Sequence, residues 1–106
     1  MKFNNSNLPH HTRDTIKHYL INGWEPGGFV TSMLAMDMER ALYTADVVNR
    51  HHIWDIGQWI LEFAPPYSWG NYDNVKAWCE DKDDRRTKWA VWYELNKEPE
   101  LDEPPF

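Results

Sequence analysis

The spacing of apolar side chains constrains this chain most, because it follows the repeat of an α-helix. The clearest stripe lies on one helical face and consists of Ile53, Ile56, Ile60 and Phe63. Pro65 and Pro66 end this helix, since the residue before a proline is displaced from helical backbone angles. No stretch of useful length alternates apolar and polar residues as a strand would. The sequence therefore predicts an all-α fold whose central helix contains the stripe.

Gly23 marks the end of the first predicted helix. This helix follows Pro9, which suits a first helical turn, and its apolar face consists of Ile16, Tyr19 and Leu20. A glycine followed by an apolar residue is typical of a Schellman motif. We therefore expect Trp24 to pack over Tyr19 beyond the end of the helix.

Polar residues mark the starts of the later helices. Asp37 separates two short predicted helices, over 28–35 and 38–48. Asn71 is the predicted N-cap of a helix that carries Val75, Trp78 and Cys79. Residues 80–88 have no apolar side chain and are predicted to be either a solvated helical face or a loop. The last predicted helix carries Trp89, Trp92, Tyr93 and Asn96.

These segments make one domain, because 106 residues are too few for a second hydrophobic core. We predict a compact bundle of four to six helices over residues 8–96. Residues 1–7 are expected to form a flexible arm. Residues 97–106 are rich in acid and proline and are expected to form an extended or disordered tail, with a short recognition motif that includes Phe106 as the alternative.

Charge and cysteine content argue against several classes of protein. The chain has 11 Lys and Arg against 17 Asp and Glu, and its net charge of −6 opposes binding to nucleic-acid phosphates. Cys79 is the single cysteine, so the chain cannot form an internal disulfide or a four-thiolate zinc site. The longest mainly apolar stretch, 53–64, contains polar residues and is too short to cross a membrane. We therefore expect a cytoplasmic protein that binds neither nucleic acid nor membrane.

No recognisable catalytic set is present in the sequence. Two histidine pairs lie at helical spacing from an aspartate, but neither completes a metal motif: His10 and His11 with Asp14, and His51 and His52 with Asp55. We interpret both as polar surface groups. Cys79 lies in an apolar row, which favours a buried and inert thiol. The sequence therefore predicts no enzyme activity, no metal and no cofactor.

The segment around Gly27 and Gly28 is the best candidate for a small-ligand site. Two glycines at the start of a helix leave its first backbone amides unshielded, which suits a phosphate or a carboxylate. Trp24 would stack on a base beside them, and Arg13 would add positive charge if the first helix packs its start nearby. The alternative is that the glycines only permit a tight turn and close helix packing.

The seven tryptophans divide into groups with different expected roles. Each ring can bury roughly 150–250 Å², and we assign Trp78, Trp89 and Trp92 to the C-terminal part of the core. The sequence does not decide whether three other rings belong to the core or to the surface: Trp54, Trp59 and Trp69. Either the face with Trp54 and Trp59 packs against the last helix, or it is partly exposed as a partner-binding or dimer surface.

Two short motifs resemble a family of small uncharacterised proteins from tailed bacteriophages. The pattern L-P-x-H-T-R occurs here as residues 8–13, and P-G-[GS]-F occurs as residues 26–29. Further positions of the likeness, which covers about residues 8–80, are Tyr19, Gly23, Leu34, Asp37, Ala45, Asp46, Asn49, Asp55, Ile56, Trp69 and Gly70. Family members are mostly shorter, so residues 81–106 depart from the pattern. The resemblance implies a phage source and the host-cell cytoplasm, and it brings no activity with it.

Two functional hypotheses follow. The first is a non-enzymatic phage accessory protein that binds and modulates or inhibits a host or phage protein, such as a component of anti-phage defence, with a homodimer as a further arrangement. Its binding residues are Trp54, Trp59 and Trp69. The alternative is a protein that sequesters a small ligand or nucleotide signal through Arg13, Trp24, Gly27 and Gly28.

Overall fold

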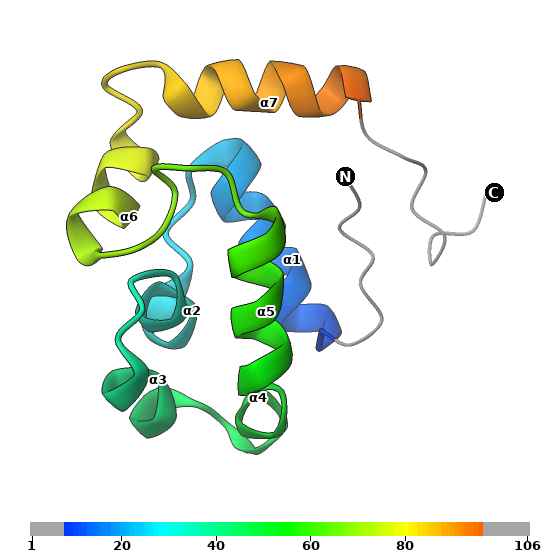
Figure 1. The fold of residues 1–106 in the computed structure, drawn as a ribbon, viewed down its shortest axis with the longest axis vertical. Coiled ribbons are helices and arrows are strands. Elements are labelled where there is room, and N and C mark those ends of the chain that lie inside the picture. The colour runs from blue at the N-terminus through cyan, green and yellow to red at the C-terminus, as the bar shows by residue number, and fades with distance from the viewer. Residues whose placement is uncertain (1–7, 97–106) are drawn as a thin grey trace, which may run out of the picture.

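The computed structural model describes residues 8–96, and the regular structure of that range is entirely α-helical (Figure 1). Seven helices follow one another in the described residues: α1 (His10–Asn22), α2 (Gly27–Leu34), α3 (Met38–Thr44), α4 (Val47–His51), α5 (Ile53–Phe63), α6 (Tyr72–Glu80) and α7 (Arg85–Asn96). The all-α prediction is confirmed, and the helices form one compact body. The predicted arm, 1–7, and the predicted tail, 97–106, lie outside the described residues.

There are more helices than the four to six predicted, because the segment 38–48 is two helices instead of one. Ala45 ends α3 in extended backbone, with φ −66° and ψ 134°. The carboxylate of Asp46 then accepts the backbone amide of Asn49 at 2.7 Å, so α4 begins with its own N-cap. The cap at Asp46 therefore divides the segment that the sequence predicted as a single helix.

Asp37 and Asn71 cap helices as predicted. The Asp37 carboxylate accepts the amide of Arg40 at 3.2 Å at the start of α3. The Asn71 side chain accepts the amide of Asn74 at 2.8 Å at the start of α6. Both contacts satisfy an amide that has no partner within its own helix.

The central helix is α2, so the prediction that residues 53–63 form the centre was wrong. Helix α2 packs against α1, α3, α5 and α6. Five of its eight residues are buried: Phe29, Val30, Ser32, Met33 and Leu34. A helix that is apolar on most sides must be surrounded, whereas one with a single apolar stripe, such as α5, covers an existing core.

Helix α5 presents a slightly different face to the core than the isoleucine stripe predicted. Ile56, Trp59 and Ile60 are buried. Ile53 is only half-buried, and Phe63 is exposed at the last turn. Because Trp59 precedes Ile60 by one residue and follows Ile56 by three, the helix turns its largest ring inward.

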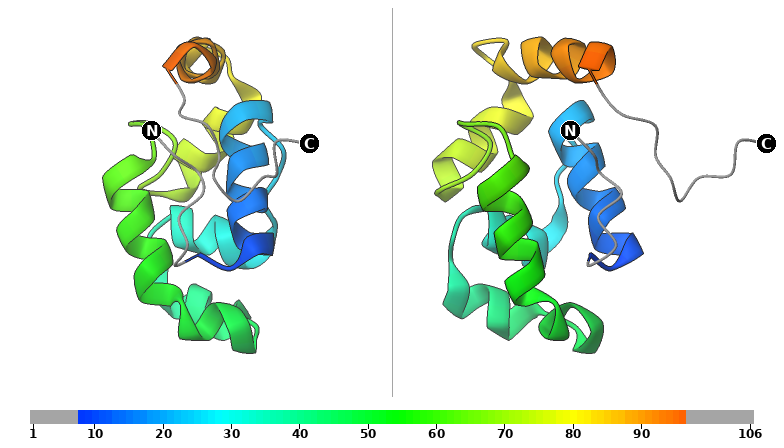
Figure 2. Two further views of the ribbon diagram at one scale, coloured as in Figure 1. Left: turned by 90° about the vertical axis from the view of Figure 1, so that its right-hand side faces the viewer. Right: turned by 45° about the vertical axis from the view of Figure 1, so that its right-hand side comes forward.

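Helix α7 lies across one end of the molecule, against α1 and α6 (Figures 1 and 2). Its Tyr93 is buried, and the Trp89 ring stacks on Tyr93 with 5.3 Å between ring centroids. Trp89 also meets the buried ring of Trp78 edge-on, at 6.2 Å. Trp92 is 49% exposed, so its assignment to the core was wrong: adjacent residues on a helix diverge by about 100°, and Tyr93 takes the inner position.

Residues 81–84 form the turn between α6 and α7, and α7 begins at Arg85. Asp81 ends α6 in left-handed backbone, with φ 53°. Its carboxylate accepts the amides of Arg86 at 2.9 Å and Thr87 at 3.2 Å, and also the Thr87 hydroxyl. Burial acts to raise the pKa of Asp81, but these hydrogen bonds and the charge of Arg86 outweigh it and leave the pKa lowered. One ionised carboxylate therefore anchors the start of α7.

Arg86 joins the C-terminal ends of α1 and α6. Its Nε donates to the carbonyl oxygen of Trp78 at 3.1 Å, and its Nη1 donates to that of Ile21 at 3.2 Å. Carbonyl groups at helix ends have no donor within the helix, and their partial negative charge favours a cation. Gly23 leaves the room for this side chain, because a Cβ there would lie 2.6 Å from the Arg86 Nε.

Tyr19 joins α1 to the turn that follows α5. The ring is completely buried, and its hydroxyl donates to the carbonyl oxygen of Ser68 at 2.7 Å. The Ser68 hydroxyl donates in turn to the carbonyl oxygen of Pro65 at 2.6 Å. Burial raises the pKa of Tyr19 far above its ordinary value of 10.0. The double proline thus ends α5 as predicted, and its turn is held on α1.

Replacing Arg86 with alanine is expected to lower the free energy of unfolding by about 1.5–3 kcal/mol, because two helix-end carbonyls lose a charged donor. Urea denaturation measures the change. Arg85→Ala is the matched control: the Arg85 guanidinium lies 3.8 Å from the ring centre of Tyr67. At that exposed site its loss should cost no more than about 1 kcal/mol. Equal losses in the two variants would contradict the joining role of Arg86.

Alkaline pH is expected to destabilise the protein partly through Tyr19. The folded state keeps this hydroxyl protonated, so its contribution is complete below about pH 10 and declines above it, by up to about 1.4 kcal/mol per pH unit. Urea titrations on both sides of about pH 10 should show a shallower decline for Tyr19→Phe than for wild type. Tyr43→Phe, at a side chain that is 90% exposed, is the control and should decline like wild type. If the free energy of unfolding of Tyr19→Phe declines with pH as steeply as that of the control, the result contradicts this role of Tyr19.

Candidate functional site

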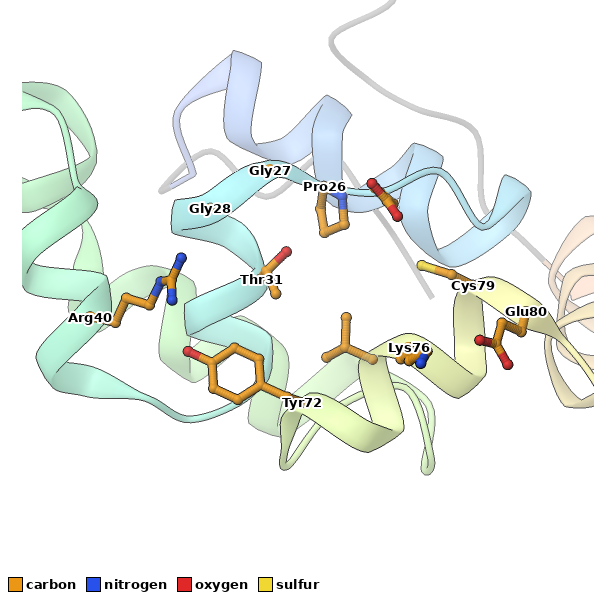
Figure 3. Close-up of a pocket in the computed structure, with 11 residues that line it drawn as sticks. Pro26, Gly27, Gly28, Thr31, Arg40, Tyr72, Lys76, Cys79 and Glu80 are labelled. Carbon is orange, nitrogen blue, oxygen red and sulfur yellow. The ribbon is translucent and has the colours of Figure 1, made fainter.

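A cavity of about 640 Å³ opens between the start of α2 and one face of α6 (Figure 3). Arg40, from α3, closes one end of it. We call this cavity the α2–α6 groove. Its volume lies within the range of sites that bind small molecules.

The two glycines singled out in the sequence both line the α2–α6 groove. Gly27 has φ +82°, in the left-handed region, so the turn into α2 favours glycine there. Gly28 has no such angle. A Cβ at either position would have no atom within 4 Å, so close helix packing accounts for neither. No side chain caps the first amides of α2, because the residue before the helix is Pro26.

Trp24 and Arg13, which the sequence grouped with these glycines, do not line the groove. The Trp24 ring is 60% exposed and stacks on His18, with 4.6 Å between ring centroids, so it does not pack over Tyr19 as predicted. Arg13 bonds the ring of His10 at 2.9 Å in the first turns of α1. The groove glycines follow the C-terminal end of α1. Arg13 lies nine residues before that end, which is about 13 Å along the helix.

Two cations that the sequence did not single out line the groove, namely Arg40 and Lys76. Within residues 8–96, neither side chain takes part in an ion pair. They come from different helices, and no local spacing relates them. Only the packing of α2 against both α3 and α6 brings them to one cavity.

Tyr72 and Asp37 set the geometry of the Arg40 end of the groove. The Tyr72 hydroxyl donates to the Asp37 carboxylate at 2.5 Å, which ties the start of α6 to the start of α3. This hydrogen bond lowers the pKa of Asp37 and raises the pKa of Tyr72. The other Asp37 oxygen accepts the Arg40 amide, so both oxygens of this carboxylate are occupied.

Cys79 and Glu80 lie at the opposite end of the groove, and Glu25 also lines the groove. Burial raises the pKa of the Cys79 thiol, and the charges of Glu25 and Glu80 raise it further. The thiol is therefore protonated at neutral pH, which disfavours a nucleophilic role, although it is half-buried and not buried as predicted. Glu80 also pairs with Lys82 at 3.2 Å. The groove thus has Arg40 at one end, and two carboxylates together with Lys76 toward the other.

The three tryptophans left open by the sequence have different positions. Trp59 is 1% exposed and belongs to the core, and Trp69 is half-buried against it. Trp54 is 76% exposed on α5. Only the last of these rings is available to a partner.

Trp54 is one of five exposed apolar side chains within residues 42–54. We call these the Trp54 surface; its members are Leu42, Tyr43, Val47, Val48 and Trp54. They belong to the segment formed by α3, α4 and the start of α5. This segment lies at the end of the molecule opposite α7 (Figures 1 and 2).

A second, smaller apolar hollow of about 430 Å³ lies between the end of α5 and α7. Phe63, Trp89 and Trp92 contribute its aromatic lining. The sequence raised the possibility that the Trp54 and Trp59 face packs on the last helix. The C-terminal end of α5 borders α7 here, whereas Trp54 does not line this hollow.

The histidine groups of the sequence form no larger cluster. The Nδ1 of His52 lies 3.2 Å from the Asp55 carboxylate. In residues 8–96, no three His, Cys, Asp or Glu side chains are arranged to hold a metal ion. Within the same range, every helix is too short or too polar to cross a membrane.

No protein-family model, curated protein or solved structure matches this chain. The motif residues that suggested a phage family have visible structural roles. Thr12 is buried, and its hydroxyl bonds the Asn49 side chain, which joins α1 to α4. Residues 26–29 form the entry into α2. The relation to that family stays a prediction.

Alanine substitutions should separate the roles of the two glycines. Gly27→Ala is expected to lower the free energy of unfolding by about 1–2 kcal/mol, because alanine is strained at a left-handed position. Gly28→Ala should be neutral or stabilising by up to about 1 kcal/mol, since its Cβ meets open space and alanine favours helix. Urea denaturation of both variants tests this, and a matching loss in Gly28→Ala is the result that contradicts it.

Proposed function

We propose that this protein is a non-enzymatic binding protein that contacts another protein through the Trp54 surface. The observation that carries the proposal is the 76% exposure of Trp54, in a segment, 42–54, that carries four other exposed apolar side chains. Exposed apolar side chains are a common feature of protein interaction sites, and tryptophan is enriched among residues that dominate binding energy.

The fold does not need Trp54 for its stability. The inner face of α5 is completed by Ile56, Trp59 and Ile60, and Trp54 lies away from it. An exposed ring of this size gains free energy when a partner covers it, on the order of 2–4 kcal/mol for a tryptophan. A role in binding explains why an exposed position carries this side chain.

The resemblance to phage proteins supports a host protein as the partner, with inhibition of a defence component as the proposed outcome and the host cytoplasm as the compartment. A phage protein is the other partner class. A second copy of this chain is a further arrangement, since the Trp54 surface is apolar and would be covered in a symmetric dimer.

A small-ligand role is the second candidate, because the α2–α6 groove brings Gly27, Gly28 and two cations together. In this candidate, Arg40 and Lys76 replace Arg13 and Trp24 as the groups that contact the ligand. A nucleotide signal is the proposed ligand class, with sequestration as the outcome.

Trp54→Ala is expected to remove the partner. The tagged wild-type protein is used as bait in a host-cell lysate, and the captured protein is identified and then titrated by calorimetry. The variant should weaken its dissociation constant by about 30-fold or more, as for a dominant interface tryptophan. Stability should change by less than about 0.5 kcal/mol, because the side chain is exposed.

Trp24→Ala is the matched control for this experiment. It removes a second exposed tryptophan, which stacks on His18 and lies outside the Trp54 surface. The control should bind the partner like wild type. Undiminished binding by Trp54→Ala, or no partner captured by the wild type, would contradict the proposed function.

A further inference from the structure

The charged side chains that line the α2–α6 groove are unevenly distributed along it, and this distribution specifies a ligand more narrowly than the size of the groove does. Figure 3 places Arg40 at one end of the groove and Cys79 with Glu80 at the other. Glu25 also lines the groove, and its charge acts on the Cys79 thiol. A ligand that fills the groove therefore meets Arg40 at one end, and two carboxylates together with Lys76 toward the other.

We propose that the groove binds a mononucleotide, with its phosphate at Arg40 and the amine-bearing edge of its base at Glu25 and Glu80. The inference rests on the second candidate function and adds to it the class of base and the direction in which the ligand lies. It is independent of the Trp54 surface.

The Arg40 end suits a phosphate. Within the described residues, Arg40 takes part in no ion pair, and the nearby Asp37 carboxylate already accepts two other hydrogen bonds. A guanidinium binds phosphate oxygens through paired, charge-assisted hydrogen bonds. Figure 3 places Lys76, the second cation of the groove, toward the Cys79 end.

The Cys79 end suits hydrogen-bond donors. Carboxylates accept hydrogen bonds from exocyclic amines of bases, as acidic side chains do with cytosine and adenine amines. The pairing of Glu80 with Lys82 engages one oxygen, Oε2, of that carboxylate. A base that carries an oxo group in place of the amine directs an acceptor at these carboxylates and keeps only the N1–H group as a donor on that edge, so we expect it to bind less tightly.

The apolar lining of the groove suits the flat, less polar part of a nucleotide. Val75 and the Tyr72 ring contribute to this lining from α6, and about 640 Å³ accommodates a base with its sugar. Aromatic rings are general stacking partners for bases. A nucleic-acid polymer is disfavoured, because the chain carries a net charge of −6 and would repel many phosphates at once.

Calorimetric titration of the whole chain tests the proposal with a matched pair of ligands, adenosine and inosine 5′-monophosphate, which differ at the amine. Wild type should bind the adenosine compound about tenfold or more tightly than the inosine compound, and inorganic phosphate more weakly than either. Arg40→Ala should weaken both nucleotides by about tenfold or more. Glu80→Gln should reduce the ratio of the affinity for the adenosine compound to the affinity for the inosine compound.

Arg50→Ala is the control, since Arg50 is exposed on α4 and does not line the groove. It should bind like wild type, and so should Trp54→Ala, which separates this result from the partner-binding test. The comparison of the two nucleotides uses only the wild-type protein, so its result does not depend on whether a variant folds. No binding of the adenosine compound, equal affinity for the two nucleotides, or unchanged affinity in Arg40→Ala would each overturn the proposal.

Discussion

The guanidinium of Arg86 satisfies carbonyl groups at the ends of two helices, and the arrangement of the other helices depends on this contact. It bonds the carbonyl oxygens of Ile21 in α1 and Trp78 in α6, while the indole Nε1 of Trp78 donates to Leu20 at 3.2 Å. The C-terminal ends of α1 and α6 are therefore held together. Because α2 starts shortly after Gly23 ends α1, the same contact positions the start of α2 against α6. The α2–α6 groove is the space that remains between them.

The two surfaces proposed to bind ligands depend on different physical effects. The Trp54 surface offers apolar area, whose burial is favourable with little dependence on direction. The α2–α6 groove offers separated charges, which select a ligand by the order of its polar groups. Helix α3 contributes to both, since Arg40 lines the groove and Leu42 and Tyr43 belong to the Trp54 surface. Its position is held by the hydrogen bond between Tyr72 and Asp37.

Helix ends were predictable wherever a local group sets them. Gly23 ends α1 in left-handed backbone, and Asn71 caps α6, as the sequence indicated. The single short helix predicted over 38–48 was wrong for the same local reason: Asp46 is a good N-cap and starts a new helix there. The predicted helix end at Gly23 was correct, but the predicted packing of Trp24 over Tyr19 was wrong, because the Trp24 ring stacks on His18.

The sequence by itself determined an all-α chain, most of its helix boundaries and a core rich in aromatic rings, because caps, prolines and apolar periodicity act within a few residues. It did not determine which of two apolar faces turns inward. Trp59 became core and Trp54 surface only when α2 covered one side of α5. Only part of the candidate site was predictable from the sequence. The two glycines form a local signal, whereas Arg40 and Lys76 line one cavity only because of helix packing, which no spacing along the chain encodes.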